Sequence, residues 1–476
     1  MKSIMKINRF FIVCAFLLSA VALQSCGSHS VKIAGDNYEF RDGMIVFDEP
    51  ERVKGQESML GFAAEPIEVV RVGFVGLGGR GYGAVERYIH IEGVEIKAFC
   101  DLEADRIEAS QAILERAGMP RAEAYTGVEG YKALCEREDL DLVYICTDWV
   151  THVPIAVYAM EHGKHVAVEV PAATNVEECW QLVDTSERTR RHCMMLENCC
   201  YDFFEMTALN MAQQGLFGEI LHVEGAYIHN LRPHWDIYYN NWRLDFNQKR
   251  RGDNYATHGF GPVCQVLNIH RGNRLTHLVA MDTKSVVGLE LAKRKMGSTE
   301  FANGDHTHTL IRTEQGQTIE IQHNVYTPRP YNRLYQITGS KGFANKYPVE
   351  GLTFDEGQLP AEVHPQAPHT SYHGFVSREV FDAAMRYYKH PIHQEIEEKA
   401  RRVGGHGGMD FVMDYRLIYC LRNGLPLDQD VYDAAEWSCV GELSGVSAKH
   451  NSMPVKFPDF TRGDWNKIQG FKFATK

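Results

Sequence analysis

Residues 69–101 constrain the fold of this chain more than any other stretch. An apolar, β-branched run leads into Gly76, Gly78 and Gly81, a helical segment follows, and a second apolar run ends at Asp101. A strand that leads into a glycine turn at the start of a helix is the context of a dinucleotide-binding fingerprint. Gly76 permits the tight turn, Gly78 lets the backbone approach a pyrophosphate, and Gly81 lets helix and strand pack closely.

Asp101 strengthens this interpretation, because the glycines alone fit a plain structural turn equally well. It lies about 20 positions after the last glycine, where a carboxylate receives the ribose hydroxyls of the nucleotide. A negative charge there repels a 2′-phosphate, so the sequence favours NAD over NADP. The free N–H groups at the start of the helix would hold the phosphates.

The amino terminus has the pattern of a targeting segment. Basic residues precede the unbroken apolar run 10–23, which is too short to span a bilayer and predicts a signal peptide over residues 1–25. The following residues resemble a bacterial lipobox, in which Cys26 becomes the first mature residue and is acylated. An ordinary signal peptide cut nearby is the alternative. We expect an exported lipoprotein, anchored at Cys26 and facing the periplasm or the cell surface of a bacterium.

Composition limits the remaining possibilities. A chain of 476 residues, 44% of them hydrophobic, can bury a large core and usually forms two or more domains. The net charge of −12 argues against nucleic-acid binding. After the amino-terminal segment we expect no membrane contact. The sequence leaves open the number of subunits, including a homo-oligomer.

Cysteine and histidine patterns give no reason to expect a metal. The 12 cysteines include no C-x-x-C pair, and Cys100, Cys146 and Cys193 lie in or beside strand-like runs. We interpret most of them as buried thiols that pack as small apolar residues. His306 and His308 alternate as in a strand, and without a third matching ligand we interpret them as structural.

The order of the apolar runs predicts an α/β protein with two principal domains. Residues 26–65 resemble a tether with a short N-terminal arm. Residues 66–198 alternate strands with helices, as a Rossmann dinucleotide-binding domain does, with later strands at 142–146, 165–169 and 192–196. Residues 199–450 predict an α+β domain with a large, open, mainly antiparallel sheet, and residues 451–476 a C-terminal arm. Expected strands are 220–228, 278–287, 307–313, 318–325 and 335–338; expected helices are 203–214, 257–270, 376–388, 407–423 and 431–446.

Side chains at the carboxyl ends of the Rossmann strands face the ligand crevice. Trp149 and His152 follow the strand at 142–146, so we expect them to line the nicotinamide side of the site. The alternative for Trp149 is packing against the helix that follows.

Glu169, Val170 and Pro171 close the next strand, and this Glu-x-Pro resembles the glucose–fructose oxidoreductase and inositol dehydrogenase superfamily. That superfamily usually has lysine at the middle position, where it assists the acid–base step. The side chain of Val170 has no titratable proton, so it cannot assist the acid–base step as that lysine does.

A narrower resemblance covers nearly the whole chain. The sequence resembles glycoside hydrolase family 109, whose members are NAD-dependent α-N-acetylgalactosaminidases, and valine in place of lysine is typical of that family. The matching blocks are residues 76–81 with Asp101, 149–152, 169–171, 197–198, 241–243, 255–262 and 327–331.

The resemblance implies a set of contacts for a cofactor and for a glycan or glycoconjugate substrate. Contacts to NAD would come from Gly79, Arg80, Asp101, Trp149, His152, Glu169, Val170 and Asn198. Contacts to the sugar would come from Tyr227, Arg243, Tyr255 and Tyr331, and His258 would lie close to both.

Our mechanistic hypothesis needs no net redox change. NAD⁺ takes a hydride from C3 of the sugar, the ketone acidifies the hydrogen at C2, and a base removes it and expels the aglycone from C1. Water then adds, and the same cofactor returns its hydride. Outside the cytoplasm no dependable pool recycles NAD, so export favours such an enzyme over a net dehydrogenase.

This route needs one base for the C3 hydroxyl and another for C2. His258 suits the first, because histidine titrates closest to neutral pH. Tyr201 or Tyr255 suits the second where a neighbouring charge lowers its pKa. Arg243 could hold hydroxyl or N-acetyl groups. The structural alternatives are local packing for His258, core or surface positions for the tyrosines, and an ordinary salt bridge for Arg243.

Two other functions remain open on the sequence alone. The first is an NAD-dependent sugar or inositol dehydrogenase of the same superfamily. The second is a sugar-binding lipoprotein whose nucleotide site is vestigial.

Overall fold

The structure is a computed structural model that describes residues 30–32, 37–363 and 373–473. The predicted signal peptide and Cys26 lie outside the described residues. Within those ranges no helix combines the length and the apolar character needed to cross a bilayer.

The first sheet contains six parallel strands in the order β6-β5-β4-β7-β8-β9. Strands β7 and β8 are buried along their whole length, which explains their continuous apolar sequence. The strands are β4 (Val70–Val75), β5 (Val94–Asp101), β6 (Glu123–Thr126), β7 (Leu142–Ile145), β8 (His165–Val168) and β9 (Cys193–Met195). Their connecting helices are α2 (Gly79–Tyr88), α3 (Ala104–Arg116), α4 (Gly130–Cys135), α5 (Trp149–Glu161) and α6 (Val176–Thr189). This confirms the Rossmann fold.

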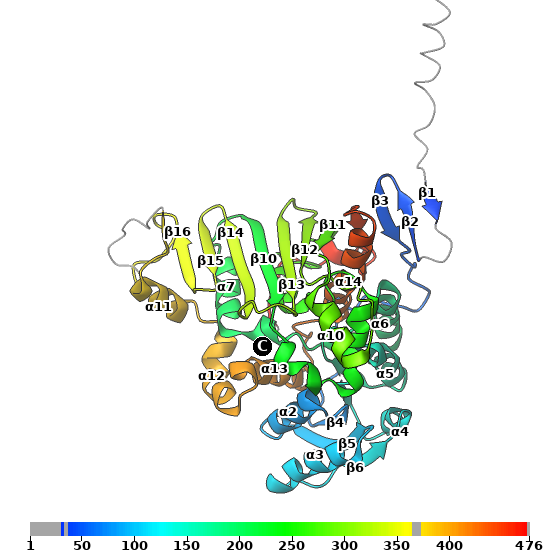
Figure 1. Ribbon diagram of the computed structural model, residues 1–476. Helices are drawn as coiled ribbons and strands as arrows, with labels where there is room; N and C mark the ends of the chain where they lie inside the picture. Colours follow the sequence, from blue (N-terminus) through cyan, green and yellow to red (C-terminus); the bar gives the residue numbers. More distant parts are fainter. Residues whose placement is uncertain (1–29, 33–36, 364–372, 474–476) are drawn as a thin grey trace, which may run out of the picture.

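The second sheet has eleven strands in the order β1-β2-β3-β17-β11-β12-β13-β10-β14-β15-β16 (Figure 1). Neighbouring strands are antiparallel except for the pairs β10–β13 and β3–β17. The strands are β1 (Ser30–Lys32), β2 (Tyr38–Arg41), β3 (Met44–Phe47), β10 (Ile220–Ile228), β11 (Leu275–Asp282), β12 (Thr307–Thr313), β13 (Thr318–Asn324), β14 (Asn332–Gly339), β15 (Gly342–Asn345), β16 (Gly351–Phe354) and β17 (Val455–Lys456). The large, mainly antiparallel sheet of the prediction is thus confirmed.

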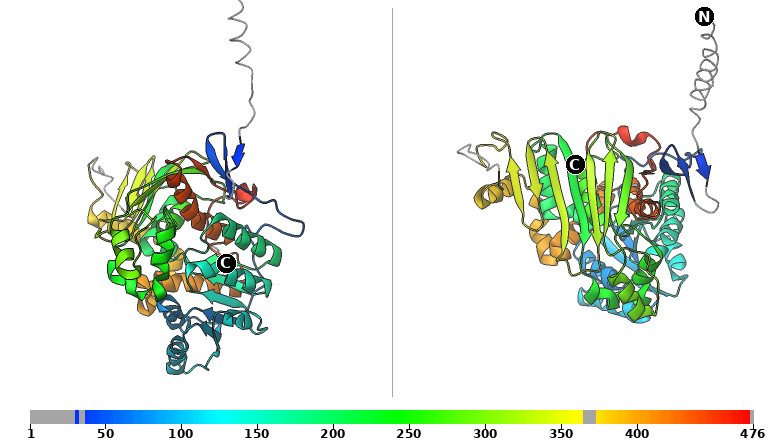
Figure 2. Two further views of the ribbon diagram at one scale, coloured as in Figure 1. Left: turned by 45° about the vertical axis from the view of Figure 1, so that its right-hand side comes forward. Right: turned by 45° about the horizontal axis from the view of Figure 1, so that its top comes forward.

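One face of this sheet is buried and the other is open. Strand β12 alternates buried and exposed residues along its length, as a sheet covered on one side requires. The helices on the covered face include α7 (Phe203–Gln213), α9 (Thr257–Val266) and α14 (Val431–Lys449), whereas the right-hand view of Figure 2 shows the strands of the other face without a helix in front. The remaining helices are η1 (Asn198–Tyr201), η2 (Arg232–Ile237), η3 (Tyr239–Asn241), α8 (Trp242–Lys249), α10 (Val287–Met296), α11 (Arg378–Tyr387), α12 (Pro391–Val403), η4 (His406–Gly408), α13 (Met409–Asn423) and η5 (Asp464–Asn466).

Helices from the C-terminal half join the two sheets. Helix α13 contacts α2 and β4 of the Rossmann part, while α14 contacts α6 and β9 there and β11 of the large sheet. The edge of the Rossmann sheet that carries the glycine loop therefore faces residues that come from the far end of the chain.

The structure differs from the sequence-based expectations at three places. Strands β2 and β3 fall in the segment expected as a tether or arm, and β17 falls in the expected C-terminal arm; all three pair into the large sheet. Where a strand was expected over 278–287, β11 ends at Asp282 and α10 begins at Val287.

All ten cysteines of the described ranges are free thiols, and all but Cys146 are buried. His306 and His308 lie in a hydrogen-bonded chain on the sheet surface. Asn324 Nδ2 lies 3.2 Å from His306 Nδ1, the two Nε2 atoms are 2.9 Å apart, and His308 Nδ1 lies 3.1 Å from Glu320 Oε1. Each ring nitrogen therefore has a protein partner, in agreement with a structural role.

Candidate active site

The glycine loop after β4 has the geometry that a bound pyrophosphate needs. Gly76 has a φ of +88°, and a Cβ on it would lie 2.6 Å from the carbonyl oxygen of Cys146. A Cβ on Gly81 would lie 1.9 Å from the carbonyl oxygen of Gly76, so loop and helix meet only because this residue is glycine. Around Gly78 and Gly79 the space is open, since the nearest atom to either added Cβ lies 3.9 Å away. The loop is thus closed toward the protein and open toward a ligand.

Asp101 fixes the loop from the end of β5. Its Oδ2 accepts a hydrogen bond of 2.6 Å from the N–H of Leu77, and its Oδ1 accepts one of 2.9 Å from the N–H of Glu103. The side chain is nearly buried, and each carboxylate oxygen keeps lone pairs for a ribose hydroxyl. The contact with ribose stays a prediction, and the structure shows in addition that Asp101 holds the glycine loop.

Two predicted cofactor contacts, Arg80 and Asn198, bond to Asp410 in α13, and a third, Glu169, bonds to Arg80. Arg80 Nε donates to Glu169 Oε1 at 2.8 Å, and Arg80 Nη1 donates to Asp410 Oδ2 at 2.9 Å. Asn198 Nδ2 donates to the other oxygen of Asp410 at 2.5 Å. Although burial opposes it, the charge of Arg80 lowers the pKa of Asp410. The C-terminal half of the chain thus supplies an anion at the cofactor side of the site.

Trp149 connects the cofactor side to the sugar side. Its ring stacks on Tyr255 with a centroid separation of 5.6 Å and an interplanar angle of 23°. The edges of Trp242 and Phe246 in α8 pack against it at 5.1 and 5.0 Å. Trp149 therefore packs against the second half of the molecule rather than against its own helix.

His152 differs from the prediction. Its Nδ1 lies 2.8 Å from the carbonyl oxygen of Pro171 and its Nε2 lies 3.2 Å from that of Thr147, and burial lowers its pKa. A neutral imidazole donates to only one of these two carbonyl oxygens, and both ring nitrogens face the protein, so neither is directed at the nicotinamide. Val170 is buried beside these loops, its side chain has no polar atom, and its backbone N–H donates to Glu169 Oε2 at 3.3 Å.

The sugar side is organised around His258, in the first turn of α9. His258 Nδ1 lies 2.8 and 3.0 Å from the two carboxylate oxygens of Glu197, and Nε2 lies 3.4 Å from the hydroxyl of Tyr255. The ring of Tyr227 packs against both His258 and Tyr255 at centroid separations of 5.3 and 4.6 Å. The structure thus brings three of the predicted residues together.

Arg243 packs against the rings of this aromatic group. Its guanidinium carbon lies 4.6 Å from the ring centre of Tyr255 and 4.9 Å from that of Trp149, and Nη1 donates to the hydroxyl of Tyr238 at 2.7 Å. Arg243 is buried, forms no salt bridge with any carboxylate of the described ranges, and its Nε has no hydrogen-bond partner there. An unpaired buried cation is costly, so its free donors are available to substrate oxygens.

Tyr331 and His229 lie at the rim of the same group. His229 Nδ1 is 3.1 Å from the hydroxyl of Tyr227, and the ring of Tyr331 packs edge-on against His229 at 5.1 Å. Burial, together with the charge of nearby His234 and Arg243, lowers the pKa of His229 to about 4. A neutral imidazole therefore borders the predicted sugar site.

Tyr201 does not belong to this group. Its hydroxyl donates to Asp428 at 3.4 Å, its ring is fully buried, and burial and that carboxylate raise its pKa well above the usual value. The prediction of Tyr201 as a catalytic base is wrong for that reason. Burial also raises the pKa of Tyr255 well above its usual value, and that of Tyr227 to about 12, despite the opposing charge of Arg243. Burial thus favours the neutral hydroxyl of Tyr255 over the phenolate.

Glu197, Cys199 and His258 place ligand-type atoms within 4.8 Å of one another. The Nη1 of Arg333 lies 2.6 Å from the sulfur of Cys199, and burial raises the pKa of that thiol. The guanidinium repels a cation, and a neutral thiol is a weaker ligand than a thiolate, so this donor set is a poor metal site.

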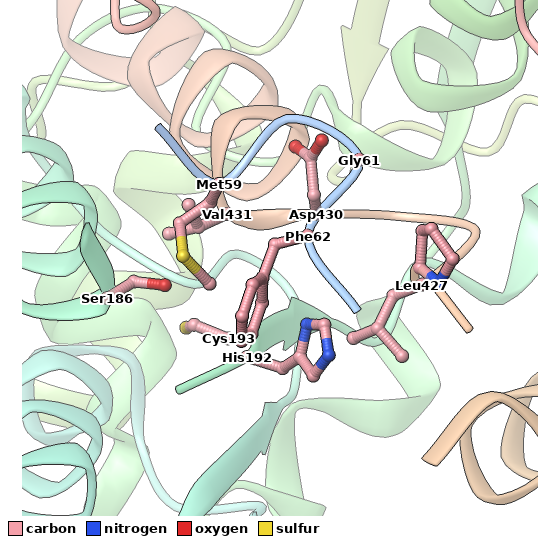
Figure 3. A pocket seen from close by; sticks show the side chains of 10 residues that line it. Met59, Gly61, Phe62, Ser186, His192, Cys193, Leu427, Asp430 and Val431 are labelled. Carbon is pink, nitrogen blue, oxygen red and sulfur yellow. The ribbon is translucent and has the colours of Figure 1, made fainter. Parts of the chain in front are cut away.

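A small cavity lies under the N-terminal segment, and Figure 3 shows Phe62 and His192 side by side in its wall. Burial lowers the pKa of His192, so the ring is neutral. Its lining contains none of the site residues named above; the lining residues are Met59, Gly61, Phe62, Ser186, His192, Cys193, Pro426, Leu427, Asp430 and Val431.

Three polar residues of the site were missed as functional candidates: Glu197, His229 and Asp410. Glu197 stands in a block that supports the family resemblance, yet nothing in its spacing links it to His258, 61 positions later. Asp410 is separated from Arg80 by 330 positions, and His229 carries no motif. Only the folded chain shows these contacts.

Comparison with known proteins defines the class first. Residues 70–197 match the model of an oxidoreductase family with an NAD-binding Rossmann fold. The structure of levoglucosan dehydrogenase in complex with NADH and L-sorbose matches with a TM-score of 0.59 and 17% identity, over 82% of this chain and 100% of that chain. Myo-inositol 2-dehydrogenase from Lactobacillus plantarum gives a TM-score of 0.55 and 16% identity, over 82% and 99%. The chain is an NAD-binding protein with the fold of these dehydrogenases.

The second half of the chain identifies the family. Residues 201–467 match the model "Glycosyl hydrolase 109, C-terminal domain". Glycosyl hydrolase family 109 protein 1 of Bacteroides thetaiotaomicron is 59% identical over 433 residues, which cover 90% of this chain and 93% of the relative. Protein 5 of Phocaeicola vulgatus is 58% identical over 451 residues, with 93% and 87% coverage. The chain therefore belongs to glycoside hydrolase family 109, which confirms the resemblance drawn from the sequence.

Proposed function

We propose that this glycoside hydrolase removes terminal α-linked N-acetylgalactosamine from glycans, in a cycle that begins and ends with NAD⁺. The observation that carries the proposal is the stack of Trp149 on Tyr255, because it joins the cofactor side to the sugar side next to His258. Two carboxylates across a glycosidic bond are the usual hydrolase arrangement, and NAD-dependent enzymes are the known exception.

The glycine loop and Asp101 fit the cofactor, as their open face and free lone pairs show. When bound, NAD supplies a hydride acceptor that later returns the hydride to the sugar. Arg80 and Asn198 border this region, both bonded to Asp410, and Glu169 is bonded to Arg80. The side chain of Val170 can pack against a ligand but cannot accept a proton, so the proton of the sugar hydroxyl must go to another group.

His258 is the group in the proposal that accepts this proton. Its Nε2 faces the hydroxyl of Tyr255, which is held as a donor by its raised pKa. The free donors of Arg243 hold oxygen atoms of the sugar in place, and Tyr227 and Tyr331 pack around the site. A positioned base of this kind contributes about 10²–10⁴-fold to rate.

The test uses p-nitrophenyl α-N-acetylgalactosaminide with no added NAD. We expect release of p-nitrophenol without a steady rise of absorbance at 340 nm, and deuterium from D₂O at C2 of the released sugar. His258→Ala should lower the rate by about 10²-fold or more while the protein still purifies with NAD.

Each alternative function predicts a different result in the same assay. Steady accumulation of NADH would identify a net dehydrogenase and contradict the proposal. No release from a panel of α- and β-linked nitrophenyl sugars would identify a binding protein. Release of p-nitrophenol without deuterium at C2 would support the hydrolase activity and refute the NAD-dependent mechanism.

A further inference from the structure

The carboxylate of Glu197 is the closest polar partner of His258 and is completely buried. Both of its oxygens lie within 3.0 Å of His258 Nδ1, and Oε1 also accepts a hydrogen bond of 3.1 Å from the N–H of Cys199. Although burial opposes it, the charge and hydrogen bond of His258 lower the pKa of Glu197. The side chain is therefore an ionised carboxylate that can only accept hydrogen bonds.

Helix α9 is built to receive this carboxylate. Gly261 lies three residues after His258, one turn along the same face of the helix. A Cβ on Gly261 would lie 2.9 Å from Glu197 Cγ and 3.0 Å from the ring of Trp437. Glycine at this position thus allows Glu197 to lie between the helix and Trp437.

An acceptor at Nδ1 determines which imidazole nitrogen carries the proton. In neutral histidine one ring nitrogen donates and the other accepts. Glu197 fixes the proton on Nδ1, so the lone pair of Nε2 points toward the hydroxyl of Tyr255, 3.4 Å away. A base needs its lone pair on the side of the substrate.

We infer that Glu197 is a positioning residue that holds His258 in the Nδ1–H tautomer, with Nε2 as the basic atom of the site. This role rests on the function proposed above, because it makes His258 ready to accept a sugar proton. The same turn carries Asn198, which bonds to Asp410 on the cofactor side. The short turn after β9 therefore positions both His258, through Glu197, and Asp410, through Asn198.

The experiment measures the tautomer directly in the full-length protein. Histidine is labelled with ¹⁵N, and the His258 signals are assigned by their loss in His258→Gln. At alkaline pH we expect a protonated, pyrrole-type Nδ1 and a pyridine-type Nε2 in the wild-type protein. In Glu197→Gln the amide can donate or accept, so we expect the two tautomers to mix.

Kinetics supply the second measurement. Glu197→Gln should lower kcat by up to about 10⁴-fold with little change in KM, as the loss of a tautomer-fixing carboxylate does in hydrolytic triads. The matched control is Glu187→Gln, the same change at another fully buried glutamate, which is bonded to Arg52 and Tyr432 instead. We expect the control to lower stability and to leave kcat and the His258 signals unchanged.

Two outcomes would overturn the inference. One is a wild-type His258 with its proton on Nε2, a result that needs no variant and so does not depend on whether Glu197→Gln folds. The other is a folded Glu197→Gln with unchanged tautomer and kcat. Failure of the glycosidase assay in the wild-type protein would refute the proposed function, whereas the tautomer would still test Glu197 separately.

Discussion

Asp253 shows how burial determines the behaviour of a single side chain in this molecule. It lies two residues before Tyr255 and has about 1% of its surface exposed. Its Oδ1 accepts a hydrogen bond of 3.2 Å from the N–H of Tyr255, while Oδ2 has no partner in the described structure. Burial raises the pKa of this carboxyl from an ordinary value of 3.8 to about 7.

Replacing Asp253 by Asn should stabilise the protein above neutral pH. The unfolded chain loses this proton near pH 4 and the folded protein near pH 7, so the carboxyl lowers stability progressively between these values. Above pH 7 the cost is constant at about 4 kcal/mol, since each pKa unit corresponds to about 1.4 kcal/mol. We expect a higher Tm for Asp253→Asn at pH 8 and an equal one at pH 4, measured by circular dichroism. An equal Tm at both pH values would contradict the raised pKa.

At this scale, sequence predicts a residue well when its role depends on near neighbours. The jobs of Gly76 and Gly81 follow from their places in one turn, and the structure agrees with both. The role of Glu197 depends on His258, which a different helix brings to it. Tyr201 failed as a candidate because its burial beside Asp428 depends on the packing of distant elements.

At the scale of elements, the β4–loop–α2 unit depends on one close approach. The Cβ that Gly81 lacks would lie 1.9 Å from a backbone oxygen of the loop, and backbone cannot move aside as a flexible side chain can. Gly83 lies one half-turn further along α2, where an added Cβ would have only an ordinary contact of 3.5 Å with Arg87.

Gly81→Ala should therefore weaken the binding of NAD, whereas Gly83→Ala should not. Relief of the clash by moving the loop costs about 1–3 kcal/mol, which corresponds to roughly a five- to 150-fold loss of affinity. The measurement is the NAD content of the purified protein and its retention on dialysis. A Gly81→Ala protein that keeps a full complement of NAD would show that the loop does not hold the pyrophosphate.

Helix α10 shows why some elements could not be predicted. Its first N–H groups, from Val286, Val287 and Gly288, donate to the carboxylate of Asp305, at distances of 2.8–3.0 Å. The cap of this helix is therefore Asp305, which lies 17–19 positions later in the sequence. The N-cap residue Val286 has no side chain that could cap the helix, so the local sequence does not mark its start. The alternating apolar pattern before it predicted a strand that continued too far.

At the scale of the whole molecule, a segment at Arg52 and a segment at Arg462 both contact α6 of the Rossmann part. The fully buried carboxylate of Glu187 binds Arg52 from the N-terminal segment at 2.8 Å and Arg462 from the C-terminal segment at 2.9 Å. Arg462 also pairs with Asp184, and the hydroxyl of Tyr432 donates to Glu187 at 2.6 Å. Two segments expected to lie loosely on the surface thus share one buried anion.

Arg52→Ala and Arg462→Ala should each lower the stability by about 1.5–3 kcal/mol, because each removes hydrogen bonds to a charged partner. Their effects should not add, since both variants act on the same carboxylate. Thermal unfolding of the two single variants and the double variant measures this coupling. Arg121→Ala, at a solvent-exposed pair with Glu108 and Glu115, is the control and should leave the stability nearly unchanged. Additive losses would mean that the two arginines act independently.

The architecture of two sheets could be predicted because the spacing of strands and helices repeats along the chain. The attachment of the ends could not, because Arg52 and Arg462 lie 135 and 275 positions from Glu187. Ion pairs between residues so far apart leave no repeating pattern in the sequence, so they could not be predicted from it.

The free thiols have a practical consequence for handling this enzyme. None of the ten cysteines in the described ranges is cross-linked, so this part of the fold depends on packing and hydrogen bonds alone. Reducing agents leave such a fold intact, and its production requires neither an oxidising compartment nor an isomerase. A bacterial cytosol is therefore a suitable place to make the catalytic body, and dithiothreitol is a harmless component of its storage buffer.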